Sequence, residues 1–244
     1  MNLTNNSDIN YLEMYQALKE TLLEYCIPDT KLEILSSYAN YVKDMQGKIN
    51  LTSLKSNEDF AIKHFKDSLI ILPYLKSGSL LDVGTGAGFP GVPLAITNEL
   101  LSVTLLDSTV KKINFLSHTI KMLGITNVVA LAGRAETIAH LPHYRKSFDY
   151  VVARAVTSLG ILLELTIPFL KISGTLFVYK SQHVDEEINN ALPVFDLLDC
   201  KLERREDYML DSNYKRSLLI IKKTSETKNI YPREYKKILS SSKN

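Results

Sequence analysis

Residues 81–91 read Leu-Asp-Val-Gly-Thr-Gly-Ala-Gly-Phe-Pro-Gly, and this stretch shows the architecture of the chain most clearly. An apolar run ends at Val83, and a helical pattern follows from Val92 to Thr97. Glycines directly after a buried strand let the backbone turn tightly and come close to a ligand, while the next helix offers free N–H groups at its start. The stretch therefore predicts a strand, a tight turn and a helix that together bind a nucleotide-like molecule.

Two ligand classes fit this turn, a dinucleotide and S-adenosylmethionine. Gly86, Gly88 and Gly91 have the G-x-G-x-x-G spacing of the dinucleotide fingerprint, which would suit a nicotinamide-dependent oxidoreductase. The strand ends before Gly84, however, and counting from Gly84 places Phe89 where the fingerprint has its third glycine. Phe89 would crowd a pyrophosphate, whereas S-adenosylmethionine has no phosphate. The turn therefore favours the methyl donor.

Short apolar runs alternate with helical patterns through residues 77–223, which is typical of a parallel sheet with crossover helices. An amphipathic pattern follows Asp107, and an apolar helical pattern covers residues 159–170. The predicted strands cover residues 80–83, 103–106, 127–131, 148–152 and 175–179, with two later strand-like runs near 195–202 and 217–221. We therefore expect an α/β fold in this part of the chain.

The two ends of the chain have a different character. Residues 1–76 show apolar residues at helical spacing, and their last helical pattern begins near Asn57 and ends at Pro73. Residues 224–244 form a tail that we expect to be poorly ordered unless a partner holds it. The sequence thus predicts an N-terminal helical extension (1–76), a cofactor-binding domain (77–223) and a basic C-terminal tail (224–244).

Composition excludes several classes of protein. Of the 244 residues, 45% are apolar and 23% are charged, as in globular proteins. The longest apolar run, residues 161–170, is too short to span a membrane, and the N-terminus has no signal-peptide pattern. Cys26 and Cys200 lie far apart and outside any Cys/His cluster, so neither a disulfide framework nor a metal site is expected. We interpret the chain as cytoplasmic, without membrane association.

The charges are unevenly distributed along the chain. The formal net charge is +2, but residues 215–244 hold nine Lys/Arg against two Glu, which gives +7 and leaves −5 for the rest. A basic segment beside an acidic body favours a polyanionic partner such as nucleic acid. A basic tail that is simply solvated fits the charge pattern equally well.

Polar residues follow the predicted strands where a ligand would bind. Asp107 ends the second strand and could accept hydrogen bonds from ribose hydroxyls of either cofactor, or it could cap the next helix. Ala135 and Glu136 follow the third strand, where a loop backbone could meet an adenine or carry a surface salt bridge. Arg154 follows the fourth and could hold a carboxylate or phosphate, or form a structural ion pair.

The N-terminal region contains a second polar group. His64, Asp67 and Ser68 are spaced so that they share one face of a helix, where they could line a cleft above the glycine turn. A single histidine on a helix is more often structural, so both interpretations stay open for His64.

The motifs together resemble a known family. In the order Asn50-Leu-Thr, Lys63-His-Phe-x-Asp-Ser-Leu, the 81–91 turn, Leu106-Asp-Ser, Arg134-Ala-Glu, Ala153-Arg-Ala and Tyr231-Pro-Arg, they are similar to bacterial small-subunit ribosomal RNA methyltransferase G, also called glucose-inhibited division protein B. The resemblance covers nearly the whole chain. It implies a class I, Rossmann-like methyltransferase fold and methyl transfer from S-adenosyl-L-methionine to N7 of a guanine in 16S ribosomal RNA.

The resemblance also assigns residues. Its cofactor contacts fall on Gly84, Phe89, Ala135, Glu136 and Arg154, with Asp107 where the ribose-side acid would be. We also expect Gly86 and Gly88 of the glycine turn to contact the cofactor. His64, Asp67 and Arg154 are then candidates for positioning the substrate. No general base is expected, because guanine N7 has a lone pair and no proton to lose, and no metal is expected.

The implied partner is 16S ribosomal RNA or a small-subunit particle, and a monomer is compatible with the sequence. A non-catalytic RNA-binding or assembly protein with the same fold is the main alternative, since fold alone does not establish function. After Arg233 the chain continues Glu-Tyr-Lys-Lys-Ile and ends in serines, which departs from the Gly/Pro/Lys-rich ending of many family members.

Overall fold

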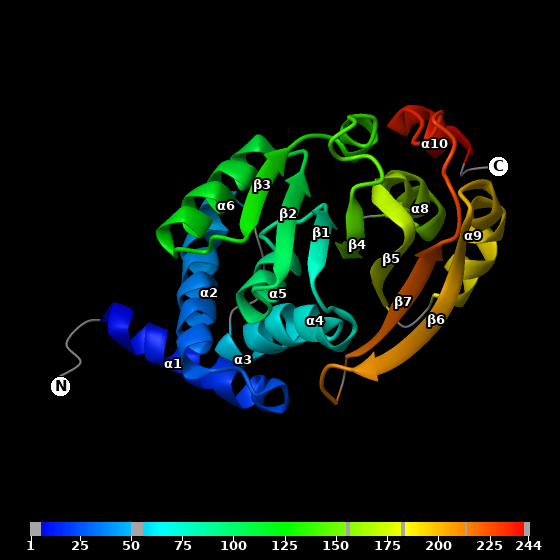
Figure 1. Ribbon diagram of the computed structural model, residues 1–244. Helices are drawn as coiled ribbons and strands as arrows, with labels where there is room; N and C mark the ends of the chain where they lie inside the picture. The colour runs from blue at the N-terminus through cyan, green and yellow to red at the C-terminus, as the bar shows by residue number, and fades with distance from the viewer. Residues whose placement is uncertain (1–5, 50–55, 155–156, 182–183, 213, 242–244) are drawn as a thin grey trace.

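The computed structural model describes residues 6–49, 56–154, 157–181, 184–212 and 214–241. Within these residues one seven-stranded sheet runs in the order β3-β2-β1-β4-β5-β7-β6 (Figure 1). The strands are β1 (Gly78–Val83), β2 (Leu101–Asp107), β3 (Val128–Ala132), β4 (Phe148–Arg154), β5 (Leu170–Ser181), β6 (Cys200–Met209) and β7 (Lys215–Lys223). Strands β1 to β5 are parallel, and β7 pairs antiparallel with both β5 and β6. The expected α/β fold is confirmed.

Helices cover both faces of the sheet. Successive residues of a strand point to opposite faces, so Leu80 packs in the core that contains α5 and α6, while Leu81 packs in the core that contains α8 and α9. The helices that follow the first strand are α5 (Gly91–Thr97), α6 (Val110–Met122), α7 (Ala135–Ile138), α8 (Leu159–Thr166), α9 (Asp185–Leu197) and α10 (Tyr235–Ser241), with a 3₁₀ turn at Ile167–Phe169. No helix in the described ranges is both long and apolar enough to cross a bilayer.

The N-terminal helices complete one face of the sheet. They are α1 (Asn6–Thr21), α2 (Asp29–Ile49), α3 (Asn57–Phe60) and α4 (Asp67–Leu69), with a π-helical turn at Ala61–Lys66 and 3₁₀ turns at Leu23–Tyr25 and Leu72–Tyr74. Helices α5 and α6 contact β1, β2 and β3, whereas the N-terminal helices share a core with Val152 of β4, Phe177 of β5 and Leu218 of β7. The Tyr179 hydroxyl on β5 donates a hydrogen bond to the Ser68 carbonyl (2.9 Å). The N-terminal helices therefore bury the half of this face that the crossover helices leave open.

Two of the predicted elements need correction. The strand-like run predicted near 195–202 is wrong, because its first residues end helix α9 and strand β6 begins at Cys200, after Asp199 turns the chain at φ 53°. Short apolar runs do not distinguish a buried helix from a strand, and helix α9 was missed for the same reason. The helix predicted over 159–170 ends at Thr166, and β5 begins at Leu170, directly after the 3₁₀ turn that contains Pro168.

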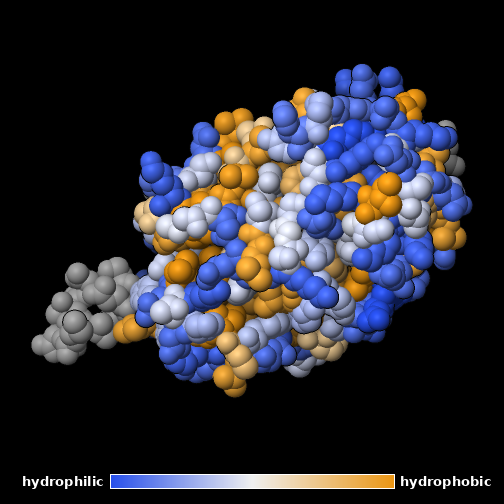
Figure 2. Space-filling view, in the orientation of Figure 1, coloured by the Kyte–Doolittle hydropathy of each residue, from blue (hydrophilic) through white to orange (hydrophobic). Residues whose placement is uncertain are grey.

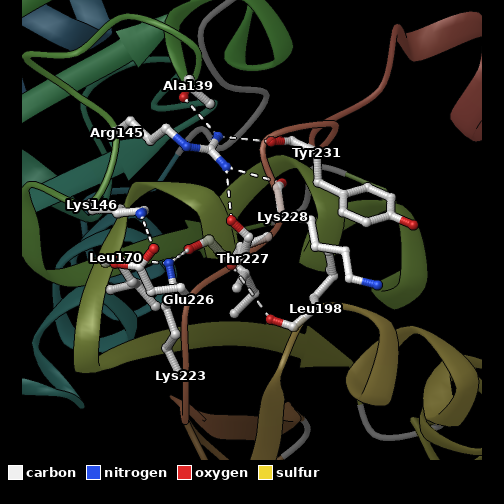
Figure 3. Close-up of polar contacts among 11 residues, drawn as sticks. Ala139, Arg145, Lys146, Leu170, Leu198, Lys223, Glu226, Thr227, Lys228 and Tyr231 are labelled. Atoms are coloured by element: carbon white, nitrogen blue, oxygen red, sulfur yellow. Dashed lines mark hydrogen bonds and ion pairs between the residues drawn. The ribbon is translucent and has the colours of Figure 1, made fainter.

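The prediction that residues 224–244 are poorly ordered is wrong for the described part of that tail. Arg145 donates hydrogen bonds to the carbonyls of Thr227 and Lys228 (3.1 Å each) and Tyr231 (2.8 Å) (Figure 3). Thr227 is buried, and Arg233 forms an ion pair with the buried Glu164 (2.7 Å). The expectation rested on the position of the segment at the chain end, and the sequence does not reveal its contacts with Arg145 and Glu164. The division of the chain into three parts remains a prediction.

Hydrophilic side chains cover the surface where α10 lies in Figure 1, at the upper right of Figure 2. Lys236 and Lys237 are exposed there, while Ile238 on the inner side is buried. Helix α10 is thus amphipathic in its packing, with a basic outer face and an apolar inner face.

Replacement of Arg145 by Met should release the C-terminal segment. The substitution keeps the apolar stem but removes charge-assisted donors from three carbonyls of that segment, so unfolding free energy should fall by about 1–3 kcal/mol. Urea unfolding would measure the loss, and hydrogen exchange over residues 227–241 should accelerate. Lys146→Met is the matched control, because the ion pair of Lys146 is with the exposed Glu226 and surface pairs contribute little. Equal hydrogen-exchange rates over residues 227–241 in Arg145→Met and Lys146→Met would contradict this account.

Candidate cofactor and substrate site

Strands β1 and β4 are parallel neighbours in the sheet, although β2 and β3 lie between them in the sequence, so the order in which strands are added to the sheet reverses between β1 and β4. In open α/β sheets the carboxyl ends of the strands beside such a reversal form a crevice for ligands. Val83, Asp107 and Arg154 end β1, β2 and β4, and all three therefore lie at this edge (Figure 1). The position agrees with the sequence-based prediction of the binding edge.

Three glycines of the turn adopt left-handed conformations that favour glycine, with φ of 73° at Gly84, 59° at Gly86 and 85° at Gly88. A Cβ on Gly86 would make only an ordinary contact with the Gly84 carbonyl oxygen (3.9 Å), whereas a Cβ on Gly88 would overlap the Tyr38 hydroxyl. The Tyr38 hydroxyl donates a short hydrogen bond to the Ala87 carbonyl. Gly88 therefore permits the turn to dock on the N-terminal helix α2, while Gly84 and Gly86 form its accessible part.

Asp82 holds both ends of the turn. Its Oδ2 accepts hydrogen bonds from the Thr85 hydroxyl (2.7 Å) and the Gly91 N–H (2.9 Å). Burial raises the pKa of Asp82 to about 6, although these two donors and the Arg154 charge act in the opposite direction. Its buried Oδ1 has no partner within the described residues. The sequence analysis included Asp82 in the motif without giving it a role. Nothing in the sequence shows that its carboxylate reaches across the turn to Gly91.

Asp107 ties the second strand to the turn. Its Oδ2 accepts the Gly86 N–H (3.0 Å) and its Oδ1 accepts the Thr109 N–H (2.8 Å). Helix α6 is capped at Thr109 rather than at Asp107, so the helix-cap alternative for Asp107 does not hold. The Lys112 ammonium also lies 3.9 Å from Oδ2. A carboxylate offers about four acceptor positions, so Asp107 keeps acceptor capacity for ribose hydroxyls. The cofactor role of Asp107 remains a prediction that this geometry permits.

A cavity of about 250 Å³ lies at these strand ends. Four predicted contacts, Gly84, Asp107, Ala135 and Glu136, line it together. The other lining residues are Val83, Leu106, Ser108, Gly133, Arg134, Leu165 and Tyr235. Exposed backbone at Gly84 and a carboxylate at Asp107 fit an adenosine-bearing ligand such as S-adenosylmethionine. Sequence reasoning missed Leu165 and Tyr235, since nothing local marks them as neighbours of this edge.

Phe89 does not line this cavity but lies among the residues that join the glycine turn to the N-terminal helices. Its side chain is buried and points into the N-terminal helices, where its ring stacks on His64 (centroids 4.7 Å apart, 19° between planes) and meets Tyr38 edge-on (5.7 Å). Phe60 and Phe65 also contact it. Any contact between Phe89 and the cofactor must therefore be made by the Phe89 backbone. The ring of Phe89 anchors the glycine turn to the helical extension.

Arg154 connects the sheet to the same helices. It forms an ion pair with Asp67 (3.1 Å), donates to the Lys63 carbonyl within the π-helical turn (3.1 Å), and contacts Nδ1 of His64 (3.2 Å). Asp67 is fully buried and also accepts the Tyr208 hydroxyl (2.7 Å). The structure thus shows the ion pair that was one alternative for Arg154 and brings the three predicted positioning residues together.

The π-helical turn places these groups. The Asp67 N–H donates to the Ile62 carbonyl five residues earlier, so the helix is widened over residues 61–66. Of His64, Asp67 and Ser68, which were predicted to share one face, His64 and Asp67 meet the same partner, Arg154. The Ser68 hydroxyl donates instead to the His64 carbonyl within the helix, and the lining of a cleft by these residues remains a prediction. Such π turns occur frequently at functional sites. The sequence predicted a regular helix here, and the widened turn was missed because side-chain spacing alone does not reveal it.

His64 is held in its neutral form. Burial lowers its pKa to about 3, and the charges of Arg154, Arg216 and Lys63 act in the same direction. A guanidinium only donates hydrogen bonds, so Nδ1 of His64 accepts from Arg154 and the proton lies on Nε2. His64 is therefore an uncharged acceptor at neutral pH.

Arg216 was not predicted as a site residue. It lies on β7 opposite Ser181 of β5 and Tyr208 of β6, and its charge acts on His64. Its Nε is buried and has no hydrogen-bond partner in the described part of the chain. A buried donor without a partner is unusual in native proteins and suggests a ligand.

Some predicted motifs lie outside the described residues, namely Asn50-Leu51-Thr52 and Ala155 of the Ala153-Arg154-Ala155 motif. Among the residues that are described, no group of three or more His, Cys, Asp or Glu could hold a metal ion.

Comparison with known proteins identifies the family. The family model described as rRNA small subunit methyltransferase G matches residues 31–227. The chain belongs to this family. A relative from Oenococcus oeni, named Ribosomal RNA small subunit methyltransferase G, is 41% identical over 212 residues, which cover 85% of this chain and 88% of the relative. A relative of the same name from Clostridium novyi is 38% identical over 234 residues, covering 94% and 96%.

Solved structures agree on the fold. M. jannaschii TYW2, determined in complex with AdoMet, has a TM-score of 0.54 and 15% identity, over 72% of this chain and 80% of that one. The cyclase SpnF has a TM-score of 0.55 and 14% identity, over 76% and 93%. The family and the fold together confirm the methyltransferase interpretation over the oxidoreductase one.

The pH dependence of stability should report the burial of His64. As pH falls through the ordinary pKa near 6.5, the unfolded chain takes up a proton that folded His64, with a pKa of about 3, does not. Stability from this group is therefore present above pH 6.5 and lost below it, by about 1–2 kcal/mol at pH 5. Urea unfolding of the wild type and His64→Gln at pH 7 and 5 should show a smaller acid loss in the variant.

His118→Gln, at an exposed position on α6, controls for the loss of a histidine as such. The same acid loss in the wild type and in His64→Gln would show that His64 is not held neutral.

Proposed function

We propose that the chain transfers the methyl group of S-adenosylmethionine to N7 of a guanine in small-subunit ribosomal RNA. The observation that carries the proposal is the family match over residues 31–227, together with one cavity lined by Gly84 of the glycine turn and by Asp107, Ala135 and Glu136 at the strand ends. S-adenosylmethionine supplies an activated methyl group when bound. The cofactor contacts proposed for this chain are Gly84, Gly86, Gly88, Phe89, Asp107, Ala135, Glu136 and Arg154.

The chemistry of the site suits an acceptor that loses no proton. Guanine N7 has a lone pair in the plane of the base, so no general base is required. His64 is neutral, and its Nδ1 is already engaged by Arg154. Burial raises the pKa of the Cys200 thiol to about 12, so this cysteine provides no thiolate. Alignment of N7 with the methyl carbon and sulfur would then supply most of the rate.

Arg154 is proposed as a positioning residue. Methyl transfer moves positive charge onto the guanine, and an unpaired guanidinium beside N7 would oppose it. Asp67 balances the charge of Arg154, and contacts to Asp67, Lys63 and His64 occupy three of its five N–H donors. The other donors are suited to the cofactor carboxylate or an RNA phosphate, while His64 and Asp67 orient the guanidinium.

The RNA partner is proposed to meet the protein beside this group. Arg216 carries a buried Nε without a partner in the described chain, and phosphate oxygens are good acceptors for guanidinium donors. The substrate would be small-subunit ribosomal RNA or a particle that contains it, encountered in the cytoplasm by a single copy of the chain. A non-catalytic assembly protein of the same fold is excluded if the purified chain methylates RNA.

The N7 acceptor predicts a flat pH profile. With RNA and cofactor saturating, the single-turnover rate should change little from about pH 6.5 to 8.5, because no essential group titrates there. His64→Asn should keep this shape even if it lowers the rate. The methylated RNA should be cleaved at the modified guanine by reduction followed by aniline. A rate that climbs tenfold per pH unit, and loses that slope in His64→Asn, would mean general-base chemistry instead.

The RNA contact predicts a change in salt dependence. Arg216→Gln should weaken binding of a small-subunit RNA fragment and reduce the slope of log affinity against log salt by about 0.7–0.9, the value for one lost phosphate contact. Filter binding at several salt concentrations would measure it. Arg204→Gln is the control, because Arg204 is exposed on β6 and pairs with Glu206. Equal slopes in both variants would exclude a phosphate contact at Arg216.

A further inference from the structure

The C-terminal segment reaches the cavity at the strand ends. Tyr235, the first residue of α10, lines the cavity together with Gly84, Asp107 and Ala135. Tyr235 is half-buried and comes from a part of the chain that lies beyond the family match, which ends at residue 227. The family match therefore does not cover Tyr235, the residue that forms this part of the cavity wall.

Apolar packing holds this wall against α8. Ile238 is buried against Ile161 and Leu165, and Tyr235 and Ala135 pack on the same cluster. Leu165 lines the cavity as well. The Tyr235 ring therefore belongs to an apolar side of the cavity, at the end where Ala135 lies, while Asp107 provides a polar group elsewhere on its lining.

A buried ion pair fixes the chain just before Tyr235. The Arg233 guanidinium donates to both carboxylate oxygens of Glu164 (2.9 Å and 2.7 Å), and its backbone N–H donates to one of them (2.8 Å). Glu164 is only 2% exposed. Two residues upstream, the Tyr231 carbonyl is held by Arg145 (Figure 3). The backbone that carries Tyr235 is thus anchored at two points before any ligand binds, which reduces the entropy cost of ordering it.

A held aromatic ring on the apolar side of a cavity, with a carboxylate in the same lining, suits a flat base attached to a sugar. The carboxylate can accept the sugar hydroxyls, and the ring can pack against the base. We propose that Tyr235 packs against the adenine of S-adenosylmethionine, so that the C-terminal segment is part of the cofactor site. The inference rests on the proposed function, and it assigns this segment a role that its basic charge did not suggest.

Fluorescence can test this directly, because the chain contains no tryptophan. Tyr235→Trp introduces a single indole, whose emission should change on titration with S-adenosylhomocysteine and saturate at the affinity that calorimetry gives for the same variant. Lys236→Trp places an indole on the next, exposed residue, outside the cavity lining. Its emission should not change. An unchanged signal from Tyr235→Trp at saturating ligand would overturn the proposal.

Calorimetry of the full chain gives the energetic test. Tyr235→Ala should weaken S-adenosylhomocysteine by about tenfold, and Tyr235→Phe should stay within about twofold of wild type, as expected for loss or retention of one ring contact. Lys236→Ala should match wild type. S-ribosylhomocysteine, which lacks the base, should bind the wild type and Tyr235→Ala equally.

The outcomes separate the two proposals. If the wild type binds no S-adenosylhomocysteine, the proposed function fails. If the wild type binds it and Tyr235→Ala binds equally well, only the role of Tyr235 fails. A loss in Tyr235→Ala that is as large for S-ribosylhomocysteine would mean that the substitution disturbs the pocket generally, and it would also overturn the contact with adenine.

Discussion

The buried carboxylate of Asp67 is the constraint on which the arrangement of the site depends. It is removed from water and accepts from Arg154 at the end of β4 and from Tyr208 on β6. A buried charge is tolerated only when it is paired and hydrogen-bonded, so these partners must stay in place. Helix α4, which begins at Asp67, is thereby fixed to strands β4 and β6 of the sheet. His64, on the π-helical turn that directly precedes Asp67, is then brought against Phe89, which belongs to the glycine turn.

Local patterns predicted most of the sheet and its ligand edge. Parallel strands with crossover helices bring their carboxyl ends to one side, which is why Gly84, Asp107, Ala135 and Glu136 could be placed together from sequence. Ends of elements were less predictable where apolar runs were short, as at the junction of α9 and β6. Over a few residues, a buried helix turn and a buried strand both appear as a continuous apolar run, so the hydrophobic pattern does not distinguish them.

The second half of the site depends on contacts between distant segments. Phe89 was predicted as a cofactor contact, but its ring packs into helices that precede it by more than twenty residues. Arg154 was assigned two alternative roles, and only the position of Asp67 shows the ion pair. Tyr235 reaches the cavity because Arg233 meets Glu164 near the middle of the chain. No spacing rule relates such residues, since the fold alone brings them together.

The electrostatics of the chain show that a count of basic residues does not by itself locate a nucleic-acid surface. Of the cations near the C-terminus, Arg233 pairs with buried Glu164, and Lys223 is buried with its ammonium donating to the carbonyls of Ile167 and Leu170. Burial lowers the pKa of Lys223 to about 8. A cation that already serves the fold releases few counterions on meeting a phosphate, and counterion release is the main source of affinity for a polyanion. The proposed RNA contact therefore falls on Arg216, whose Nε has no hydrogen-bond partner among the described residues, and not on Arg233 or Lys223, although all three belong to the same basic stretch of sequence.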